Sequence, residues 1–227
     1  MHTIGRYVRA AAVAAMALAG AAPALAQTGE EAGRPDAPRV IRSWTSDRRH
    51  FQPGDLITVL IDASTRYGTR RILRQVAGHK LSAHALTHAH PDHQGASHNV
   101  CERLGIPFWV GEADADAAET PDLIGERQPD HFMAQLFFKT CTGPGHPVDR
   151  KLAEGDEVAG FQVLHVPGHS AGHVAFWREA DRVLIAGDVF NSANPFTGIP
   201  GLRLPYDFFT PDPAQNRRSA KRLHDTT

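Results

Sequence analysis

The residues with the clearest potential for chemistry form one short cluster, His88-Ala-His90-Pro-Asp92-His93. Imidazole nitrogens and carboxylate oxygens are both good ligands for Zn²⁺. Two histidines two residues apart at the end of a strand point the same way, because side chains alternate along a strand. Pro91 favours the exit of the chain from the strand, because proline cannot donate to the ladder. The cluster therefore predicts a metal site, with Asp92 and His93 turned toward a second ion.

Two segments further along the chain carry residues of the same kind. His169 follows Pro167-Gly168, a turn at which the backbone can approach a metal closely. Asp188 follows an apolar stretch, and a buried carboxylate there is costly unless a cation lies beside it. One carboxylate can bridge two ions, so we expect His169 and Asp188 to join the first cluster. We expect His173 to be a core or supporting residue of the next strand and not a ligand.

Other kinds of chemistry find less support in the sequence. A histidine-rich surface loop is the alternative interpretation of the first cluster. Ser170 has no positioned base partner, which disfavours a Ser/His/Asp hydrolase. The formal net charge of -1 gives no reason to expect nucleic acid or an anionic membrane as partner, so a small-molecule substrate is favoured. The arginines at 48–49 and at 70–74 are interpreted as solvated faces.

The elements that must position these residues alternate between strands and helices. Strands are expected at Leu56–Ala63, His84–Thr87, Ile106–Val110, Phe161–Val166, His173–Trp177 and Arg182–Ala186. Helices are expected at Thr69–Ala77, after the histidine cluster with Ala96, Val100 and Leu104 on one face, and after an N-cap at Asp212. Residues 111–147 are expected to form helix and loop, and residues 191–211 a long loop. This order implies a layered α/β arrangement.

The N-terminus is typical of an export signal. Arg6 and Arg9 precede an apolar stretch that is too short for a membrane span, and Ala24-Leu25-Ala26 fits a small-x-small cleavage site. A disordered alanine-rich extension is the alternative. We divide the chain into an expected signal peptide at residues 1–26, a linker at residues 27–39 and one domain at residues 40–227. The mature protein would then be periplasmic or secreted, without a membrane segment.

The two cysteines, Cys101 and Cys141, lack metal-ligand spacing. An exported protein can form a disulfide. Cys101, however, falls on the apolar side of an expected helix, which favours a buried free thiol over a bridge. The sequence does not indicate an oligomeric state.

Taken together, these motifs resemble the metallo-β-lactamase superfamily from roughly Leu56 to Leu223. The HxHxDH motif of the family matches residues 88–93, its next histidine matches His169, and its metal-bridging aspartate matches Asp188. The run Ile61-Asp62-Ala63-Ser64 looks like the strand-end aspartate that the family uses as structural support near the metals. The resemblance implies an α/β fold, a four-layer αβ/βα sandwich with the metals at one edge of the two sheets.

The resemblance also implies a ligand set and an activity. His88, His90 and His169 would hold one Zn²⁺, and Asp92 and His93 would hold a second, with Asp188 between them. The implied activity is that of a zinc-dependent hydrolase acting on a carboxylic ester, thioester or lactone through a metal-bound hydroxide, because Zn²⁺ lowers the pKa of bound water. Asp92 would orient the hydroxide and shuttle a proton.

The sequence departs from the family pattern near both ends. Residues 39–55 are charged where the family shows a clearer pair of strands. The family has a further histidine on a strand after the helix that begins here at Asp212, whereas this sequence ends at Thr227. We therefore expect a fold incomplete at its C-terminal end, with its last strand missing and a weakened second metal site. His224, at the end of the helix, is expected to be exposed and unliganded.

The substrate is less defined than the metal site. Aspartate at position 188, where some β-lactamases of this fold use another residue, favours ester, thioester and lactone hydrolases. The run at residues 167–173 looks like glyoxalase II, but the stretch after Asp188 lacks the cysteine-containing continuation of those enzymes. An ester or lactone hydrolase is the leading hypothesis. A β-lactam hydrolase, a phosphodiesterase and a degenerate, non-catalytic metal-binding protein are the alternatives.

Overall fold

The computed structural model describes residues 39–40 and 59–226. The expected signal peptide at 1–26 and all but the last residue of the expected linker lie outside the described residues. Among the described residues, no helix has the length and apolar character that crossing a bilayer requires. Contacts divide the chain into two units, and the smaller one is described only at residues 190–204.

The first sheet of the larger unit consists of four parallel strands. They are, in spatial order, β2 (Val59–Ile61), β3 (Ala83–Ala85), β4 (Phe108–Gly111) and β5 (Arg150–Leu152). Parallel neighbours need crossover connections. These contain α2 (Thr69–Gln75), α3 (Pro91–Gln94), α4 (Ser97–Leu104), η1 (Glu112–Asp114), α5 (Ala115–Glu119), α6 (Asp122–Glu126) and α7 (Phe132–Cys141). Residues 111–147, predicted as helix and loop, thus contain several short helices joined by loops.

The second sheet is antiparallel except at one edge. Its order is β1 (Arg39–Val40), β9 (Val183–Ile185), β8 (Val174–Arg178), β7 (Phe161–His165) and β6 (Glu157–Val158). β1 runs parallel to β9, with Arg39 opposite Val183. The residue expected to end the linker is therefore already paired in the sheet.

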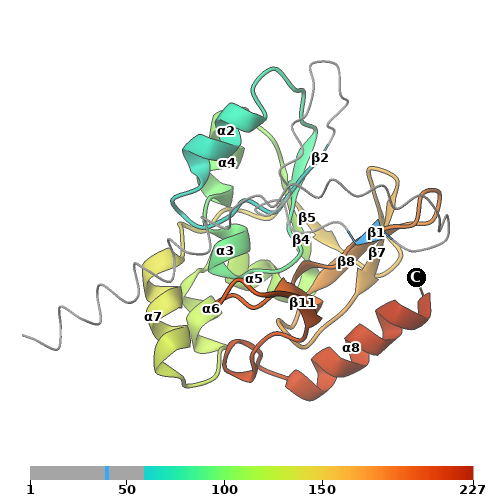
Figure 1. Ribbon diagram of the computed structural model, residues 1–227. Coiled ribbons are helices and arrows are strands. Elements are labelled where there is room, and N and C mark those ends of the chain that lie inside the picture. The colour runs from blue at the N-terminus through green and yellow to red at the C-terminus, as the bar shows by residue number, and fades with distance from the viewer. Residues whose placement is uncertain (1–38, 41–58, 227) are drawn as a thin grey trace, which may run out of the picture. The chain divides into compact units, whose positions relative to one another are not determined.

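The two sheets pack face to face, and helices cover their outer faces (Figure 1). The layer between the sheets contains buried residues of both, such as Ala85 and Leu152 of the first and Phe176 of the second. On one outer face α2 and α4 pack on β2. On the other lies α8 (Pro213–Thr226), whose Ser219 hydroxyl donates to the Pro167 carbonyl at 2.7 Å. This is the predicted four-layer αβ/βα sandwich.

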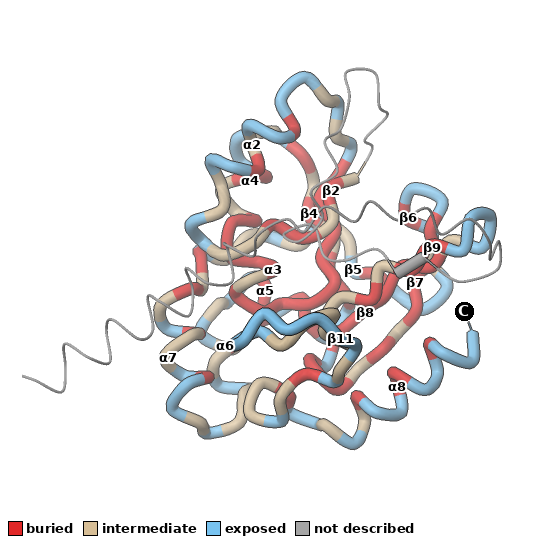
Figure 2. The backbone as a smooth tube through the Cα atoms, viewed as in Figure 1, coloured by how far each residue is buried: buried red, intermediate tan, exposed pale blue. Residues whose placement is uncertain are grey.

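The local signals that predicted α4 and α8 are realised in the structure. The Asp212 carboxylate accepts a hydrogen bond from the Gln215 amide at 2.8 Å, which satisfies one of the free donors at the start of α8. In α4, Val100 is fully buried and Leu104 packs on the same cluster, as their spacing predicted. Figure 2 shows the result: buried backbone runs through both sheets, while most of α8 is exposed.

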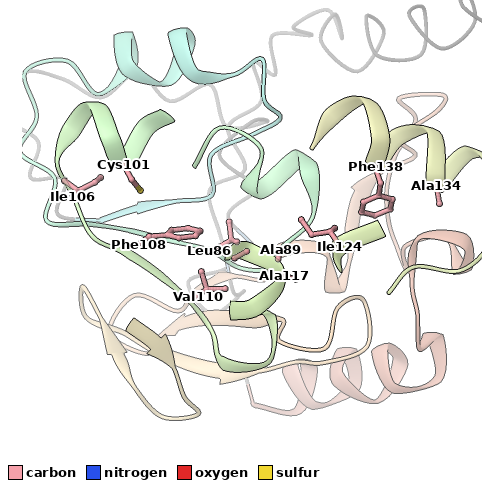
Figure 3. Packing of buried hydrophobic residues seen from close by; sticks show 11 residues of the cluster. Leu86, Ala89, Cys101, Ile106, Phe108, Val110, Ala117, Ile124, Ala134 and Phe138 are labelled. Atoms are coloured by element: carbon pink, nitrogen blue, oxygen red, sulfur yellow. The ribbon is translucent and has the colours of Figure 1, made fainter. Parts of the chain in front are cut away.

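A third apolar cluster lies between the first sheet and the helices that pack on it, mainly those that follow β4. Figure 3 shows part of it gathered around Leu86 and Phe108. Cys101 belongs to this cluster, and both cysteines are free and buried, as the sequence favoured. Burial raises the pKa of the Cys101 thiol to about 12, helped by the nearby Asp149 carboxylate, so the thiol stays protonated and inert.

The smaller unit corrects one prediction. Part of the stretch expected to be a long loop is a hairpin of β10 (Asn191–Ala193) and β11 (Pro200–Arg203). Its turn is organised by the Asn194 carboxamide, whose oxygen accepts from the Phe196 amide at 2.9 Å and the Thr197 amide at 3.1 Å. Such an Asx turn reverses the chain locally. Composition indicated a turn, but it did not reveal that the flanking residues pair.

Candidate metal centre

The histidine cluster lies beyond the first sheet, in the loop and short helix that follow β3. The strand ends at Ala85, so side-chain alternation does not orient His88 and His90, contrary to the sequence argument. Instead, His90 is the extended residue before α3, and Pro91 occupies the first helical position. The rings of His88 and His90 nevertheless lie next to one another, edge to face, with centroids 4.6 Å apart.

His169 is likewise placed by a turn after a strand. β7 ends at His165, and Gly168 has a φ of +132°. A Cβ on Gly168 would lie 2.3 Å from the backbone nitrogen of Asn216 in α8. The Pro-Gly turn was expected to allow close approach of a metal, but the group that approaches Gly168 closely is the backbone of α8. Glycine here lets the turn pack on the helix and so sets the position of His169.

Asp188 lies in η2 (Gly187–Val189), the short turn that follows β9. One carboxylate oxygen, Oδ1, is 3.4 Å from Nε2 of His93, and the other, Oδ2, is 3.7 Å from Nε2 of His169. The carboxylate therefore stands between the two histidines that the sequence assigned to different ions. This is the arrangement that a bridging ligand requires.

Two overlapping groups of side chains could each hold a metal ion, with potential ligand atoms within 4.8 Å of one another. The first group is His88, His90 and His169, all buried, and the second is His88, His93 and Asp188. Asp92 is in neither group. Its Oδ2 is 3.6 Å from Nε2 of His93, and 43% of its side chain is exposed.

The other histidines of the prediction lie where the sequence suggested. His173 is buried, with its ring centroid 4.5 Å from that of His88, and it belongs to neither group of potential ligands. His224 is exposed on α8 and faces Asp225 at 3.2 Å.

A hydroxyl behind His88 fixes the orientation and tautomer of the ring. Thr87 Oγ1 is 3.0 Å from Nδ1 of His88 and donates to the Asp62 carboxylate at 2.9 Å. A hydroxyl has a single proton, so Thr87 must accept its other hydrogen bond from the N–H of His88. The lone pair of His88 is consequently on Nε2, which faces the centre.

His169 is held in the same way. Its Nδ1 is 3.1 Å from Thr210 Oγ1, and this hydroxyl donates to the Tyr206 carbonyl at 3.0 Å. The N–H of the ring is therefore on Nδ1, and the lone pair is on Nε2. Neither threonine was predicted from the sequence. Thr87 directly precedes His88 and Thr210 is 41 residues from His169, and neither position belongs to a recognisable motif.

His90 has a different partner. The side-chain amide of Gln128, in the segment between α6 and α7, donates to Nε2 of His90 at 2.9 Å. A metal held through Nε2 would take the place of this hydrogen bond. Gln128 therefore has to turn aside when the metal binds.

Two carboxylates, Asp62 and Asp114, organise the loops from behind. Asp62 has a φ of 59°, an uncommon conformation for a residue other than glycine. It accepts from the Thr87 amide at 2.8 Å and faces Nδ1 of His93 at 2.9 Å. It therefore ties the start of the cluster to its last histidine, the supporting role that the sequence suggested.

Asp114, which the sequence analysis did not single out, connects the two histidine-bearing loops. It accepts from the Ala89 amide at 3.0 Å and from the Ser170 hydroxyl at 2.5 Å, and the Gly172 amide donates to it at 2.7 Å. Burial raises its pKa even though these hydrogen bonds oppose the shift. The one sequence signal was an acid just after a strand, the same placement that drew attention to Asp62.

The electrostatics divide the centre into two sides. Burial lowers the pKa of His88, His90 and His169, the last to about 4, so these imidazoles are neutral at pH 7. Burial would also lower the pKa of His93, but Asp92 and Asp188 outweigh it and raise that pKa well above the usual range. Burial would raise the pKa of Asp188, and the nearby His93 instead holds it far below the usual range.

The neutral side is unsatisfied as it stands. Nε2 of His88 and Nε2 of His169 are both buried, and neither has a hydrogen-bond partner. A buried polar atom without a partner costs about 1–3 kcal/mol. Lone pairs that converge from rigidly held imidazoles onto one point are what a divalent transition metal requires. The residues present therefore fit a metal ion.

Comparison with known proteins agrees with this geometry. The sequence model of the metallo-beta-lactamase superfamily matches residues 54–225. A "Probable metallo-hydrolase YflN" of Bacillus subtilis is 27% identical over 173 residues, covering 68% of this chain and 66% of that protein. A "Hydroxyacylglutathione hydrolase" of Pseudomonas putida is 46% identical over 113 residues, covering 42% of this chain and 43% of that protein.

Solved structures give the same result. TTHA1623, crystallised in a di-iron-bound form, has a TM-score of 0.57 and 34% identity, covering 74% of this chain and 76% of that one. TTHA1429 of Thermus thermophilus, a metallo-beta-lactamase family protein, has a TM-score of 0.50 and 26% identity, with coverages of 73% and 60%. The chain spans about half to two thirds of the length of the curated relatives that it matches.

Proposed function

The chain belongs to the metallo-beta-lactamase superfamily, and on that premise we propose that it is a metal-dependent hydrolase of a small carboxylic ester, thioester or lactone. The observation that carries the proposal is the pair of buried, unpartnered Nε2 atoms of His88 and His169, which converge beside the Asp188 carboxylate. Two such atoms do not contribute to the stability of the fold, because each unpartnered nitrogen destabilises the folded state. Their placement is explained if both nitrogens bind a cation that activates water.

We assign the metal ligands as the sequence suggested. His88, His90 and His169 would hold one ion, His93 and Asp92 a second, and Asp188 would reach both. When bound, such ions supply a water of lowered pKa and polarise the carbonyl under attack. Zinc is our choice of ion, and the di-iron form of the relative TTHA1623 makes iron the competing choice.

The residues of the chain have separate tasks in this scheme. Thr87 and Thr210 hold the imidazole N–H groups away from the centre, so that the lone pairs face inward. Asp92 is the carboxylate with the most exposed side chain of this cluster, at 43%. It is therefore placed to accept a proton from the attacking water and to pass it to the leaving group.

The substrate class follows from chemistry and from relatives. Curated relatives from Haemophilus influenzae and Pseudomonas putida are named hydroxyacylglutathione hydrolases, that is, thioester hydrolases. They match less than half of this chain and less than half of their own length. We therefore extend to this protein the acyl-transfer chemistry, with an ester, thioester or lactone as substrate, and not glutathione recognition.

A substrate panel on protein of measured metal content tests the proposal. The panel contains a nitrophenyl ester, an acyl thioester with and without a glutathione moiety, a lactone and a chromogenic β-lactam. We expect turnover of an ester, thioester or lactone that depends on metal and is lost on chelation. Turnover of the β-lactam alone would replace our substrate class with the alternative one. Metal-loaded protein that hydrolyses none of these compounds would support a non-catalytic metal-binding protein.

The identity of the ion is tested separately. Apo protein is titrated with Zn²⁺ and, without oxygen, with Fe²⁺, and hydrolysis is followed at each stoichiometry. We expect zinc to bind first at the three-imidazole group, because neutral imidazole ligands suit zinc well. Activity restored by iron and not by zinc would overturn the choice of metal and leave the ligand assignment intact.

A further inference from the structure

A third group of potential metal ligands lies apart from the residues of the centre described above. It consists of His98, Glu102 and His146, and their ligand atoms also lie within 4.8 Å of one another. We propose that these three residues form a second kind of metal site. It would bind a structural Zn²⁺ that links α4 to the segment following α7.

The helix supplies two of the ligands on one face. His98 and Glu102 are four residues apart in α4, and residues at that spacing are neighbours on a helix surface. His98 is half-buried and Glu102 is exposed, with 63% of its side chain accessible. The pair therefore stands at the edge of the protein, where an ion can enter from solvent.

The third ligand comes from a segment that is held firmly against the fold. The His146 amide donates to the Ala118 carbonyl at 3.2 Å, and its ring packs on Phe108 with centroids 5.9 Å apart. A Cβ on the preceding Gly145 would lie 2.0 Å from the Glu119 carbonyl oxygen, so only glycine permits this close path. Only 11% of the His146 side chain is exposed. The imidazole is thus fixed before any ion arrives.

The distances fit a tetrahedral ion. Two nitrogens at the usual Zn–N distance from a tetrahedral ion stand about 3.3 Å apart. Nδ1 of His98 and Nδ1 of His146 are 3.2 Å apart, with ring planes inclined at 68°. Glu102 Oε1 is 3.9 Å from Nδ1 of His146, and the exposed glutamate needs only a small rotation to complete three ligands. The fourth position would be left to water.

The protonation state of the group also suits a metal. Burial and the neighbouring His98 lower the pKa of His146, so the imidazole offers a lone pair at neutral pH. The simpler alternative is a hydrogen bond between the two imidazoles, one donating and one accepting. That alternative leaves Glu102 without a role, and it predicts no response to zinc.

An ion at this place would act on stability. His98 and His146 are 48 residues apart in the sequence, and a ligand that binds only the folded chain shifts the folding equilibrium by mass action. Because α4 directly follows the loop of the first centre, the ion would also fix the position of the helix that supports that loop. None of the three residues belongs to the first centre.

The experiment compares bound zinc in the full chain and in the double variant His98→Gln/Glu102→Gln. Glu102 is exposed and His98 is half-buried on α4, so we expect the double variant to retain the fold. Zinc is titrated into apo protein with a chelator as competitor, and bound metal is measured after gel filtration together with the thermal midpoint. We expect the variant to bind about one ion fewer per chain, and to lose part of the zinc-induced rise in midpoint, while ester hydrolysis per first-centre ion is unchanged.

The matched control is His224→Gln/Asp225→Asn, which removes another imidazole–carboxylate pair on a helix, 3.2 Å apart. The control should bind as much zinc as the parent chain. His146→Gln, which changes the third ligand, should reproduce the loss of one ion. The proposal is overturned if the α4 variant binds the same number of ions with the same zinc-induced shift, or if the control loses as much zinc as the variant does. A destabilisation that is equal with and without zinc would leave only the imidazole–imidazole hydrogen bond.

Discussion

The two sides of the first metal centre solve the same problem with different chemistry. On one side, His88, His90 and His169 are buried and neutral. Hydroxyls hold His88 and His169 from behind, whereas the Gln128 amide donates to Nε2 of His90. On the other, His93 lies among the carboxylates of Asp92 and Asp188 and carries a raised pKa. We call the first the imidazole side and the second the carboxylate side.

The two sides differ in what satisfies their polar groups when no metal ion is bound. The carboxylate side is satisfied by a proton on His93, because its carboxylates then have a cation beside them. The imidazole side leaves two buried Nε2 atoms without partners, and no proton satisfies them cheaply, because burial opposes the charge. We therefore expect the first ion to bind on the imidazole side and the second ion to compete with a proton on His93.

The largest effect should follow from breaking the imidazole side. In His90→Ala the first ion loses one of three ligands, and because Asp188 reaches both positions the second is weakened as well. Loss of an outer-sphere partner alone commonly lowers metal affinity 10–100-fold, so loss of a ligand should lower affinity and hydrolysis by more than about 100-fold. Metal analysis and ester turnover measure both. His131→Ala, which changes a histidine at the start of α7, should retain metal and turnover, and unchanged metal content in His90→Ala would contradict the ligand assignment.

Asp188→Asn should affect the two sides unequally. The carboxamide keeps the volume and one carbonyl oxygen but loses the charge, so the carboxylate side retains only a weaker ligand while the three imidazoles remain. We therefore expect a smaller loss than for a deleted ligand, with the second ion binding about 10–100-fold more weakly and the first changing less. Calorimetric titration resolves the two events. Equal weakening of both would mean that the two sides form one indivisible site.

Thr210→Val should have a smaller effect, confined to the imidazole side. The nearly isosteric change removes the acceptor of the His169 N–H and frees the ring to change tautomer. Such outer-sphere changes lower metal affinity about 10–100-fold, and we expect the low end because two other imidazoles remain. Thr140→Val is the control, since that hydroxyl contacts groups of its own helix, the Leu136 and Phe137 carbonyls and the Cys141 sulfur. A loss of metal affinity in both variants would indicate general destabilisation.

The sequence predicted the elements and the principal residues of the centre because each carries a local signal. The HxHxDH cluster, the Pro-Gly turn before His169 and the acid after an apolar strand are all readable within a few residues. The reason for their placement was less accessible. His88 and His90 were assigned to the end of a strand, but that strand ends at Ala85. The error arose because the end of a strand is set by its pairing in the sheet and not by its own sequence.

What the sequence could not predict were the contacts made across long separations. Asp114 meets Ser170 and Gly172, which are 56 and 58 residues away, and Thr210 meets His169 from 41 residues away. No local pattern encodes these pairs, because they depend on how the two sheets and the helices are stacked. The hairpin at β10 and β11 was missed for a related reason, since a Pro/Gly-rich stretch predicts turns but not which residues pair across them.

One further histidine separates the effect of burial from the effect of metal. His84 is fully buried, like the imidazole side, but both of its nitrogens have partners: Nδ1 faces the Leu60 carbonyl at 3.1 Å and Nε2 faces the Ser97 hydroxyl at 2.8 Å. It therefore shows what a buried neutral imidazole contributes when it needs no ion.

Burial lowers the pKa of His84 from 6.5 to about 4, so the folded state binds fewer protons than the unfolded state in this interval. The contribution is thus fully present above pH 6.5 and is lost as the pH falls toward 4. A difference of this size corresponds to roughly 3 kcal/mol at most. We expect His84→Asn to be less stable than the parent chain at pH 7 and to lose less stability between pH 6.5 and 4.

Urea denaturation of the metal-loaded proteins measures the free energy of unfolding of each protein against pH. Metal-loaded protein is used because its imidazole side takes up protons only by releasing its ion. Parallel curves for the two proteins would show that the acid sensitivity arises elsewhere, and a curve for the parent chain that steepens on chelation would show that the unoccupied imidazole side joins His84 in taking up protons.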